Sequence, residues 1–391
     1  MMRKITSDIT FIGTDDDNLD LFEAQYPLTS GISYNSFIIQ DEKIAIVDAV
    51  DIRRIDDWIA NIDSILHDGT QPDYLIIHHM EPDHSGGVRT LLAKYPDLKI
   101  VCTRQAAAML ANFFEDIDFS DNVMTVADGE TLSLGRHELK FLTAPMVHWP
   151  EVMMTVDLTE GILFSSDAFG SFAMSSSVDA WPTEARRYYS NIVGRFGANV
   201  QAILKKVGAH DIKMIAPLHG PILSENLDYY LGLYDKWSRY QPEDRGVLVL
   251  YASIYGGTAD AARRLASMLD RAGAGDVVLM DLCRHDVSYA LAEAWRLSGL
   301  MLCSVTYDAD VFPAMHNFLH HIEQKKLTGR YIGIMGNGSW APAATQVMTK
   351  AIEGMKNMEI LQPVITLKSR LHKADIPDLL QLADAFSKEN L

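Results

Sequence analysis

The stretch His79-Met80-Glu81-Pro82-Asp83-His84 places four potential metal ligands within six residues. It follows the apolar run 74–77 and leads into a Ser-Gly-Gly turn, so it lies where a buried strand is expected to end. Alternate side chains of an extended segment point to opposite sides, which lets one short loop serve two metal ions. A solvated acidic turn is the alternative, but it does not explain the two flanking histidines. The stretch therefore predicts a metal site.

The types of ligand in this loop narrow the choice of metal. A zinc hydrolase with a loop of this shape usually has a second histidine where Glu81 stands. A carboxylate at that position makes the site harder and more anionic. Mixed histidine and carboxylate ligands favour iron or manganese over zinc by ligand type and geometry. Redox chemistry is therefore the leading interpretation.

Three further ligand candidates each follow an apolar segment that is predicted to be a strand. His148 follows residues 141–147, Asp167 follows 161–166, and His219 follows 214–218. Functional sites are commonly built where strand ends gather at one edge of a sheet. A dinuclear site with one bridging carboxylate needs seven ligands, and the candidates are His79, Glu81, Asp83, His84, His148, Asp167 and His219.

Length, composition and net charge limit the classes of protein to which this chain can belong. A length of 391 residues favours two domains, and 48% hydrophobic with 22% charged residues is an ordinary globular composition. The net charge of -18 argues against nucleic acid and anionic membranes as partners. Residues 1–8 lack the apolar core of a signal peptide, and no apolar run is long enough to cross a bilayer. We therefore expect a cytoplasmic location.

The cysteines exclude a fused iron–sulfur module. Only Cys102, Cys283 and Cys303 are present, and no two of them have metal-ligand or redox-motif spacing. A rubredoxin module would need two Cys-pair motifs. Electrons must therefore come from a separate donor.

The chain is predicted to form two domains, residues 1–245 and 246–391. In the first, short apolar runs separated by turns and then strand–helix alternation predict an αββα sandwich. The segment 241–246 is polar and rich in turn residues, which marks the boundary. In the second, five predicted strands alternate with helices and indicate a doubly wound parallel sheet, with strands near 247–251, 277–282, 300–305, 331–335 and 360–365.

At the metal loop the sequence resembles the flavodiiron proteins (A-type flavoproteins), in the two-domain form without a fused rubredoxin. These proteins join a metallo-β-lactamase-like domain to a flavodoxin-like domain, and the resemblance covers essentially the whole chain. It implies that His79, Glu81 and His148 bind one iron, that Asp83, His84 and His219 bind the other, and that Asp167 bridges them. Strict alternation would instead group Asp83 with His79 and Glu81, so this assignment requires the chain to turn at Pro82.

The resemblance also implies FMN in the second domain. Hydroxyls, glycines and free backbone N–H groups at a helix N-terminus form a cradle for a phosphate. Gly257 and Ser339 depart from the residues usual in the family, and Trp340 either stacks on the flavin or packs in the core or at the rim. Three loops fall where flavodoxins hold the flavin, namely Ser253-Ile254-Tyr255-Gly256-Gly257-Thr258, Val305-Thr306-Tyr307-Asp308 and Asn337-Gly338-Ser339-Trp340.

The resemblance and the alternation of side chains along a strand also give expectations for other positions. The segment Phe22–Tyr26 resembles one that faces the metal pocket, where some members carry a histidine; that position is unfilled here. His78 is expected to point away from His79 and to support the site from outside. The remaining histidines match no ligand position and are expected on the surface or on helix faces, and they include His137.

By resemblance, the protein is an oxidoreductase that reduces dioxygen to water, nitric oxide to nitrous oxide, or both, at a non-haem diiron site with electrons relayed by FMN. The alternatives are a zinc-dependent β-lactamase-fold hydrolase with an accessory flavodoxin domain and a non-enzymatic flavin electron carrier. The expected donor is a rubredoxin, another flavoprotein or a reduced deazaflavin. A head-to-tail homodimer, alone or paired into a tetramer, is expected to bring one subunit's flavin to the other's irons.

Overall fold

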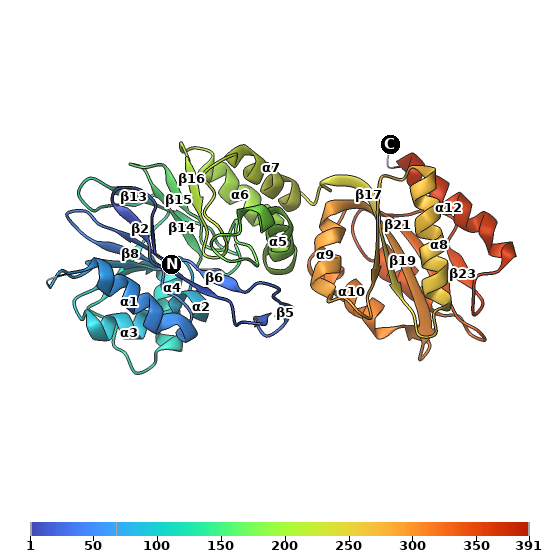
Figure 1. Ribbon diagram of the computed structural model, residues 1–391, viewed down its shortest axis with the longest axis horizontal. Coiled ribbons are helices and arrows are strands. Elements are labelled where there is room, and N and C mark those ends of the chain that lie inside the picture. The colour runs from blue at the N-terminus through green and yellow to red at the C-terminus, as the bar shows by residue number, and fades with distance from the viewer. Residues whose placement is uncertain (1, 68, 390–391) are drawn as a thin grey trace. The chain divides into compact units, whose positions relative to one another are not determined.

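The computed structural model describes residues 2–67 and 69–389. The chain divides into two units, which are Met1–Tyr189 with Ala198–Asp235, and Ser190–Gly197 with Lys236–Leu391. Figure 1 shows the first unit in blue to green and the second in yellow to red. We keep 1–245 and 246–391 as proposed domain limits. No helix of the described residues is long and apolar enough to cross a membrane.

The first unit is built on two sheets that pack face to face. Apolar side chains of both sheets form one buried cluster, with Phe11, Phe37 and Val101 from one sheet and Phe141 and Phe164 from the other. The first sheet has the order β1 (Arg3–Lys4), β2 (Ile9–Phe11), β7 (Phe37–Ile39), β8 (Ala45–Val47), β9 (Tyr74–Ile76), β10 (Lys99–Thr103) and β11 (Val123–Val126). The second has the order β12 (Thr131–Ser133), β13 (Glu138–Thr143), β14 (Met153–Asp157), β15 (Ile162–Phe164) and β16 (Met214–Ala216).

Helices cover the outer faces of this sandwich (Figure 1). Helix α1 shows why they form: Ile55, Trp58 and Ile62 recur at helical spacing and are buried, while the polar residues between them face solvent. The helices are α1 (Ile55–Ile65), α2 (Pro82–Ser85), α3 (Val88–Lys94), α4 (Arg104–Phe113), α5 (Trp181–Tyr188), α6 (Gly197–Val207) and α7 (Leu227–Ser238). Two small hairpin-like pairs complete the unit, β3 (Thr14–Asp16) with β6 (Ile32–Tyr34) and β4 (Leu21–Phe22) with β5 (Tyr26–Pro27).

The strand directions bring the predicted ligands to one edge of the sandwich. Strand β9 runs parallel to β8 and β10, and the loop with His79 begins just after it. Strands β15 and β16 are parallel, and Asp167 and His219 follow their ends. His148 precedes β14, which is antiparallel to β15, so it returns to the same edge.

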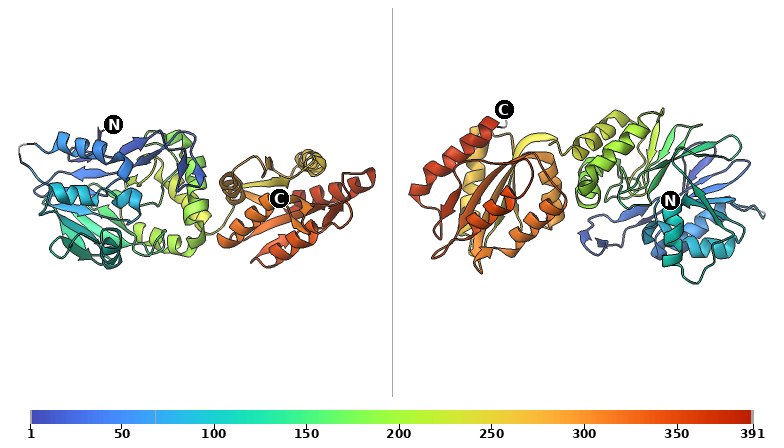
Figure 2. Two further views of the ribbon diagram at one scale, coloured as in Figure 1. Left: turned by 90° about the horizontal axis from the view of Figure 1, so that it is seen from below. Right: turned by 180° about the vertical axis from the view of Figure 1, so that it is seen from behind.

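The second unit is a parallel sheet with helices on both faces (Figure 2). Its strand order starts from the second strand and passes through the first, which is the flavodoxin-like arrangement. The strands are β18 (Asp276–Asp281), β17 (Asp244–Ala252), β19 (Leu297–Tyr307), β21 (Arg330–Asn337) and β22 (Met358–Ile360), with β23 (Ile365–Leu367) also on β21 and β20 (Asp310–Val311) on β19. The helices are α8 (Gly257–Ala272), α9 (Val287–Arg296), α10 (Pro313–Gln324), α11 (Ala344–Glu353) and α12 (Ile376–Glu389).

Two local predictions were wrong. Residues 360–365 do not form one strand, because Pro363 has no backbone N–H for the ladder and the edge divides into β22 and β23. His137 is not on the surface or on a helix. It is buried in the turn before β13, where its Nδ1 lies 2.7 Å from Asp157 Oδ2.

We expect His137→Leu to destabilise the first unit. The substitution leaves the buried Asp157 carboxylate without its imidazole partner, and breaking a buried pair in this way costs about 3–5 kcal/mol. Urea unfolding followed by circular dichroism measures the loss. The double variant His137→Leu/Asp157→Leu replaces both partners by apolar groups and should recover most of it. A single variant as stable as the parent protein would contradict the role of this pair.

Candidate metal centre and cofactor pocket

The turn required at Pro82 is present. Glu81 is the residue before α2, and Pro82 occupies its first turn, where the missing N–H costs nothing. Asp83 and His84 therefore lie on a helical turn and leave the side that His79 and Glu81 occupy. Strict strand-like alternation, which would have grouped Asp83 with His79, does not hold past Pro82.

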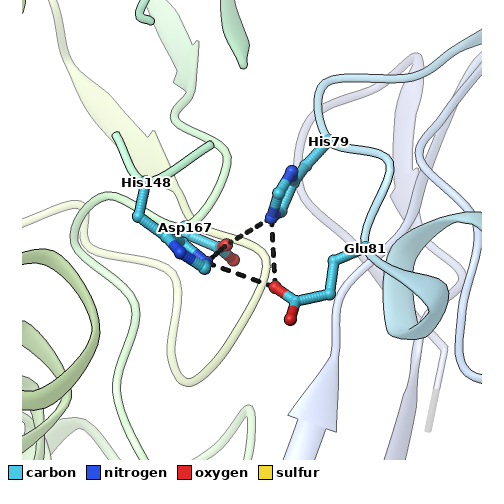
Figure 3. A group of neighbouring side chains, drawn as sticks. All are labelled: His79, Glu81, His148 and Asp167. Atoms are coloured by element: carbon cyan, nitrogen blue, oxygen red, sulfur yellow. Dashed lines mark hydrogen bonds and ion pairs between the residues drawn. The ribbon is translucent and has the colours of Figure 1, made fainter. Parts of the chain in front are cut away.

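All seven predicted ligands lie together in two groups. His79, Glu81, His148 and Asp167 form the first, and Asp83, His84 and His219 form the second. Figure 3 shows the first group, with the side chains of His79 and His148 both directed toward Asp167 and Glu81. In it, Glu81 Oε2 lies 3.1 Å from His79 Nε2 and 3.2 Å from His148 Nε2. In the second group, Asp83 Oδ2 lies 3.4 Å from His84 Nε2 and 3.3 Å from His219 Nε2.

Asp167 lies between the two groups and presents one oxygen to each. Its Oδ2 is 3.3 Å from the Nε2 atoms of both His79 and His148. Its Oδ1 is 3.2 Å from His84 Nε2 and 3.7 Å from His219 Nε2. A carboxylate placed in this way suits a bridge between two metal ions.

Several polar atoms of the site lie around common centres without a hydrogen bond of suitable geometry. Within the described residues, both carboxylate oxygens of Asp83 and of Asp167, and Nε2 of His84 and His219, are buried without a hydrogen-bond partner of suitable geometry. Unpaired buried polar groups are costly, and in native proteins they call for an explanation such as an ion. The donor set therefore fits a pair of cations.

Electrostatics in this cluster are strongly coupled. Burial lowers the pKa of His148, but its close contacts with the carboxylates of Asp167 and Glu81 outweigh burial and raise the value to about 9. Burial also lowers the pKa of His84, but the charges of Asp83 and Asp167 outweigh burial and raise the value to about 8. For Glu81, burial raises the pKa, while His148 and His79 lower it to about 2. Glu81 thus stays ionised, and the imidazoles of His148 and His84 attract protons or cations.

Supporting residues hold the outer sides of the imidazoles, and sequence reasoning did not find most of them. His79 Nδ1 lies 2.7 Å from Glu151 Oε1, and His219 Nδ1 lies 2.7 Å from Ser33 O. The one local signal for Glu151 was its position three residues after His148. His78 points away from the metal centre, as expected, with Nδ1 at 2.5 Å from Asp48 Oδ2.

A hollow of about 490 Å³ gives access to the metal centre. Glu81 and Asp83 line it together with Glu23 and Ala24 of the loop between β4 and β5. Phe22, Glu23 and Ala24 of the segment Phe22–Tyr26 thus line the hollow beside the metal ligands, and the segment contains no histidine. The Phe22 ring packs edge-on against His219, with ring centroids 5.2 Å apart.

The three predicted loops of the second unit line one pocket of about 500 Å³. All of their predicted residues line it except Gly256 and Tyr307. Ala309, Ala341 and Ser369 line it in addition. Tyr307 faces a neighbouring hollow with His316 and His320 instead. Ser369 was missed because it follows β23, whose bounds the sequence did not predict.

The pocket residues fit a flat ligand with a phosphate. Asn337 Nδ2 donates to Thr258 Oγ1 and to Ser369 O, both at 3.1 Å, and so ties the loops together. A Cβ on Gly257 would lie 2.5 Å from Ser369 O, so only glycine lets the backbone pass this closely at the start of α8. The N-terminus of this 16-residue helix suits an anion. Trp340 and Tyr255, 93% and 99% exposed, present aromatic surface beside it.

Fold and site together define a class of protein, one that combines a β-lactamase-like dinuclear metal domain with a flavodoxin-like domain. Residues 32–220 match the family described as ODP family beta lactamase. The anaerobic nitric oxide reductase flavorubredoxin of Aliivibrio salmonicida is 30% identical over 352 residues, 87% of this chain and 70% of that protein. The nitric oxide reductase of Moorella thermoacetica is 29% identical over 377 residues, 93% and 92% of the two chains.

Solved structures agree with this placement. Rubredoxin oxygen:oxidoreductase from the anaerobe Desulfovibrio gigas superposes with a TM-score of 0.92 at 25% identity, over 100% of this chain and 98% of that one. The flavodiiron protein of Giardia intestinalis gives a TM-score of 0.93 at 22% identity, over 100% and 97%, which shows the shared fold. The chain belongs to the flavodiiron protein family. The predicted family and fold class are confirmed.

Metal binding should release protons. At pH 7 the metal-free protein carries protons on His148 and His84, whose pKa values are about 9 and about 8, and a metal ion needs the neutral imidazole. Addition of ferrous ions under argon in weak buffer with a pH indicator should therefore acidify the solution. The release should shrink as the pH rises past 9, and metal affinity should fall as the pH is lowered from 9 to 6. Release that does not change with pH would contradict this electrostatic picture.

Trp340→Ala should weaken FMN binding without unfolding the protein. The side chain is 93% exposed, and aromatic stacking contributes about 1 kcal/mol beyond the area it buries, so the Kd for FMN should rise by about fivefold or more. Titration of the flavin-free protein with FMN, followed by flavin fluorescence, measures the change. Tyr229→Ala, an exposed aromatic of the first unit, is the matched control and should have no effect. Equal Kd values for Trp340→Ala and the parent protein would exclude a stacking role.

Proposed function

We propose that the protein reduces dioxygen to water, nitric oxide to nitrous oxide, or both. As a flavodiiron protein it is an oxidoreductase, and its cofactors are a diiron pair and FMN. The observation that carries the proposal is the position of Asp167, whose two oxygens face two separate ligand groups. The same chain also contains a pocket lined by the three loops that were predicted to hold FMN. The names of the relatives, nitric oxide reductase and rubredoxin oxygen:oxidoreductase, support both reactions.

The residues proposed as iron ligands divide as the two groups do. His79, Glu81 and His148 would hold one ion, Asp83, His84 and His219 the other, and Asp167 would bridge. When bound, the two irons supply a site where a small gas binds and receives electrons, and FMN supplies those electrons. With three side chains and a shared carboxylate for each ion, the protein would leave coordination positions for substrate.

The surrounding side chains suit a small and uncharged substrate. Phe22 and Tyr188 pack against His219, with ring centroids 5.2 and 5.6 Å away, and form an apolar wall beside the second group. The carboxylates Glu81 and Asp83 line the hollow that leads to the metals and would repel anions. A neutral diatomic gas is compatible with the apolar wall and is not repelled by these carboxylates. A hydrolase is disfavoured because Glu81 replaces the expected histidine and because the chain carries a flavin pocket.

Partners follow from what the described chain contains. Cys102 and Cys303 are buried and Cys283 is exposed, so these three cysteines do not form an iron–sulfur centre among the described residues. We therefore propose that another protein or cofactor supplies the electrons. The proposed donors are a rubredoxin, another flavoprotein or a reduced deazaflavin. The flavin pocket and the metal centre belong to different units, so we propose a head-to-tail homodimer, alone or within a tetramer. A cytoplasmic location stays a prediction.

Anaerobic stopped-flow mixing of the reduced, iron- and FMN-loaded protein with dioxygen or with nitric oxide tests this function. Flavin reoxidation by one or both gases should be much faster than with the variant Asp167→Ala, which keeps the flavin pocket but loses the carboxylate shared by both ions. Iron analysis should give about two ions per chain in the parent protein, the number a dinuclear centre requires.

The variant serves as its own control for the flavin. Reduced flavin reacts directly with dioxygen, so only the difference between the parent protein and Asp167→Ala reports on the metals. If the parent protein and Asp167→Ala react at the same rate with dioxygen, and also at the same rate with nitric oxide, the proposed function is overturned. Bound zinc with hydrolytic activity in place of iron would favour the alternative.

A further inference from the structure

The outer nitrogens of the metal-facing imidazoles have unequal partners. His79 Nδ1 lies 2.7 Å from the carboxylate oxygen Oε1 of Glu151. His219 Nδ1 instead donates to a neutral group, the backbone carbonyl of Ser33, also at 2.7 Å. His84 Nδ1 is buried and has no hydrogen-bond partner among the described residues. Only His79 thus has a negatively charged partner among these three.

Glu151 is held rigidly in this position. Its side chain is fully buried, and the same Oε1 accepts the backbone N–H of Met80 at 3.0 Å. Its own carbonyl accepts the hydroxyl of Thr103, at the end of β10, at 2.8 Å. One carboxylate oxygen therefore fixes both the ring of His79 and the backbone that follows it. This leaves His79 Nε2 directed at Glu81 and Asp167.

The carboxylate changes the chemistry of the imidazole as well as its orientation. A ring that donates Nδ1–H to a carboxylate is a more basic ligand than one that donates to a carbonyl, so it gives more electron density to its metal. The first group also has more negative charge. It has Glu81 and Glu151 in addition to the shared Asp167, whereas the second has Asp83 and the shared Asp167.

We propose that Glu151 is a positioning residue that makes the two metal positions inequivalent. The ion held by His79, Glu81 and His148 binds more tightly and is the first of the two to lose an electron to an added oxidant such as ferricyanide. This inference rests on the proposed diiron function and extends it to the order of oxidation within the pair.

The neighbouring histidine provides a matched control. His78 has the same kind of pairing, with Nδ1 at 2.5 Å from the buried carboxylate of Asp48, but its other nitrogen lies 2.7 Å from Thr155 Oγ1 and faces no metal ligand. Asp48→Asn and Glu151→Gln thus each neutralise one buried carboxylate beside adjacent histidines. Only the second change should reach the metals.

Mössbauer spectroscopy of the protein loaded with iron-57 tests the inference. The all-ferrous parent protein should show two distinct quadrupole doublets, and oxidation by half an equivalent per iron should convert one of them first. Glu151→Gln should shift one doublet, raise the reduction potential of that iron and weaken its binding by about 10- to 100-fold. Asp48→Asn should leave both doublets and both affinities unchanged.

The outcomes separate the inference from the function beneath it. Two irons that give a single doublet, or a Glu151→Gln spectrum in which neither or both doublets shift, would overturn the inequivalence while leaving the diiron function intact. The same shift in Asp48→Asn would show a general structural effect and also overturn it. If Glu151→Gln does not fold or does not bind FMN, oxidation of the parent protein by half an equivalent per iron still tests the inference. Equal conversion of both irons would exclude it. If the protein does not bind a pair of irons, the proposed function itself is wrong.

Discussion

Burial of ionised carboxylates in the metal centre is the constraint on which the first unit depends. Asp167 is fully buried among four imidazoles, and an isolated buried carboxylate costs several kcal/mol. The charge is tolerable only if cations compensate it and if the imidazoles stay where they are. Ligands from both sheets meet at Asp167, so the sandwich must hold its strand ends in register around this one side chain.

Short backbone turns fix the positions of the ligands around Asp167. Pro82 starts a helical turn that redirects Asp83, and Gly220 follows His219 at φ +81, where a Cβ would come within 2.0 Å of Ser171 Oγ. The outer hydrogen bonds of His79 and His219 then remove the remaining freedom of those rings. Ligand geometry is thus set by backbone first and by side-chain contacts second.

The sequence showed the parts of this site that follow local rules. The ligands follow apolar runs, whereas the turn at Pro82 that splits the motif was expected only from the family resemblance, since strand alternation alone grouped Asp83 with His79 and Glu81. The supporting contacts were hidden because they join residues 72 positions apart for His79 and Glu151, and 186 for His219 and Ser33. His137 was misplaced for the same reason, since its partner Asp157 lies across a hairpin. Ser369 was missed because Pro363 breaks the last strand in a way that apolar pattern alone did not reveal.

The exposed aromatics of the flavin pocket have a consequence for the life of the protein in the cell. Until a flavin covers them, Tyr255 and Trp340 present apolar rings to solvent, the kind of surface that promotes self-association and recognition by chaperones and proteases. A newly made chain is therefore most vulnerable before it acquires its flavin.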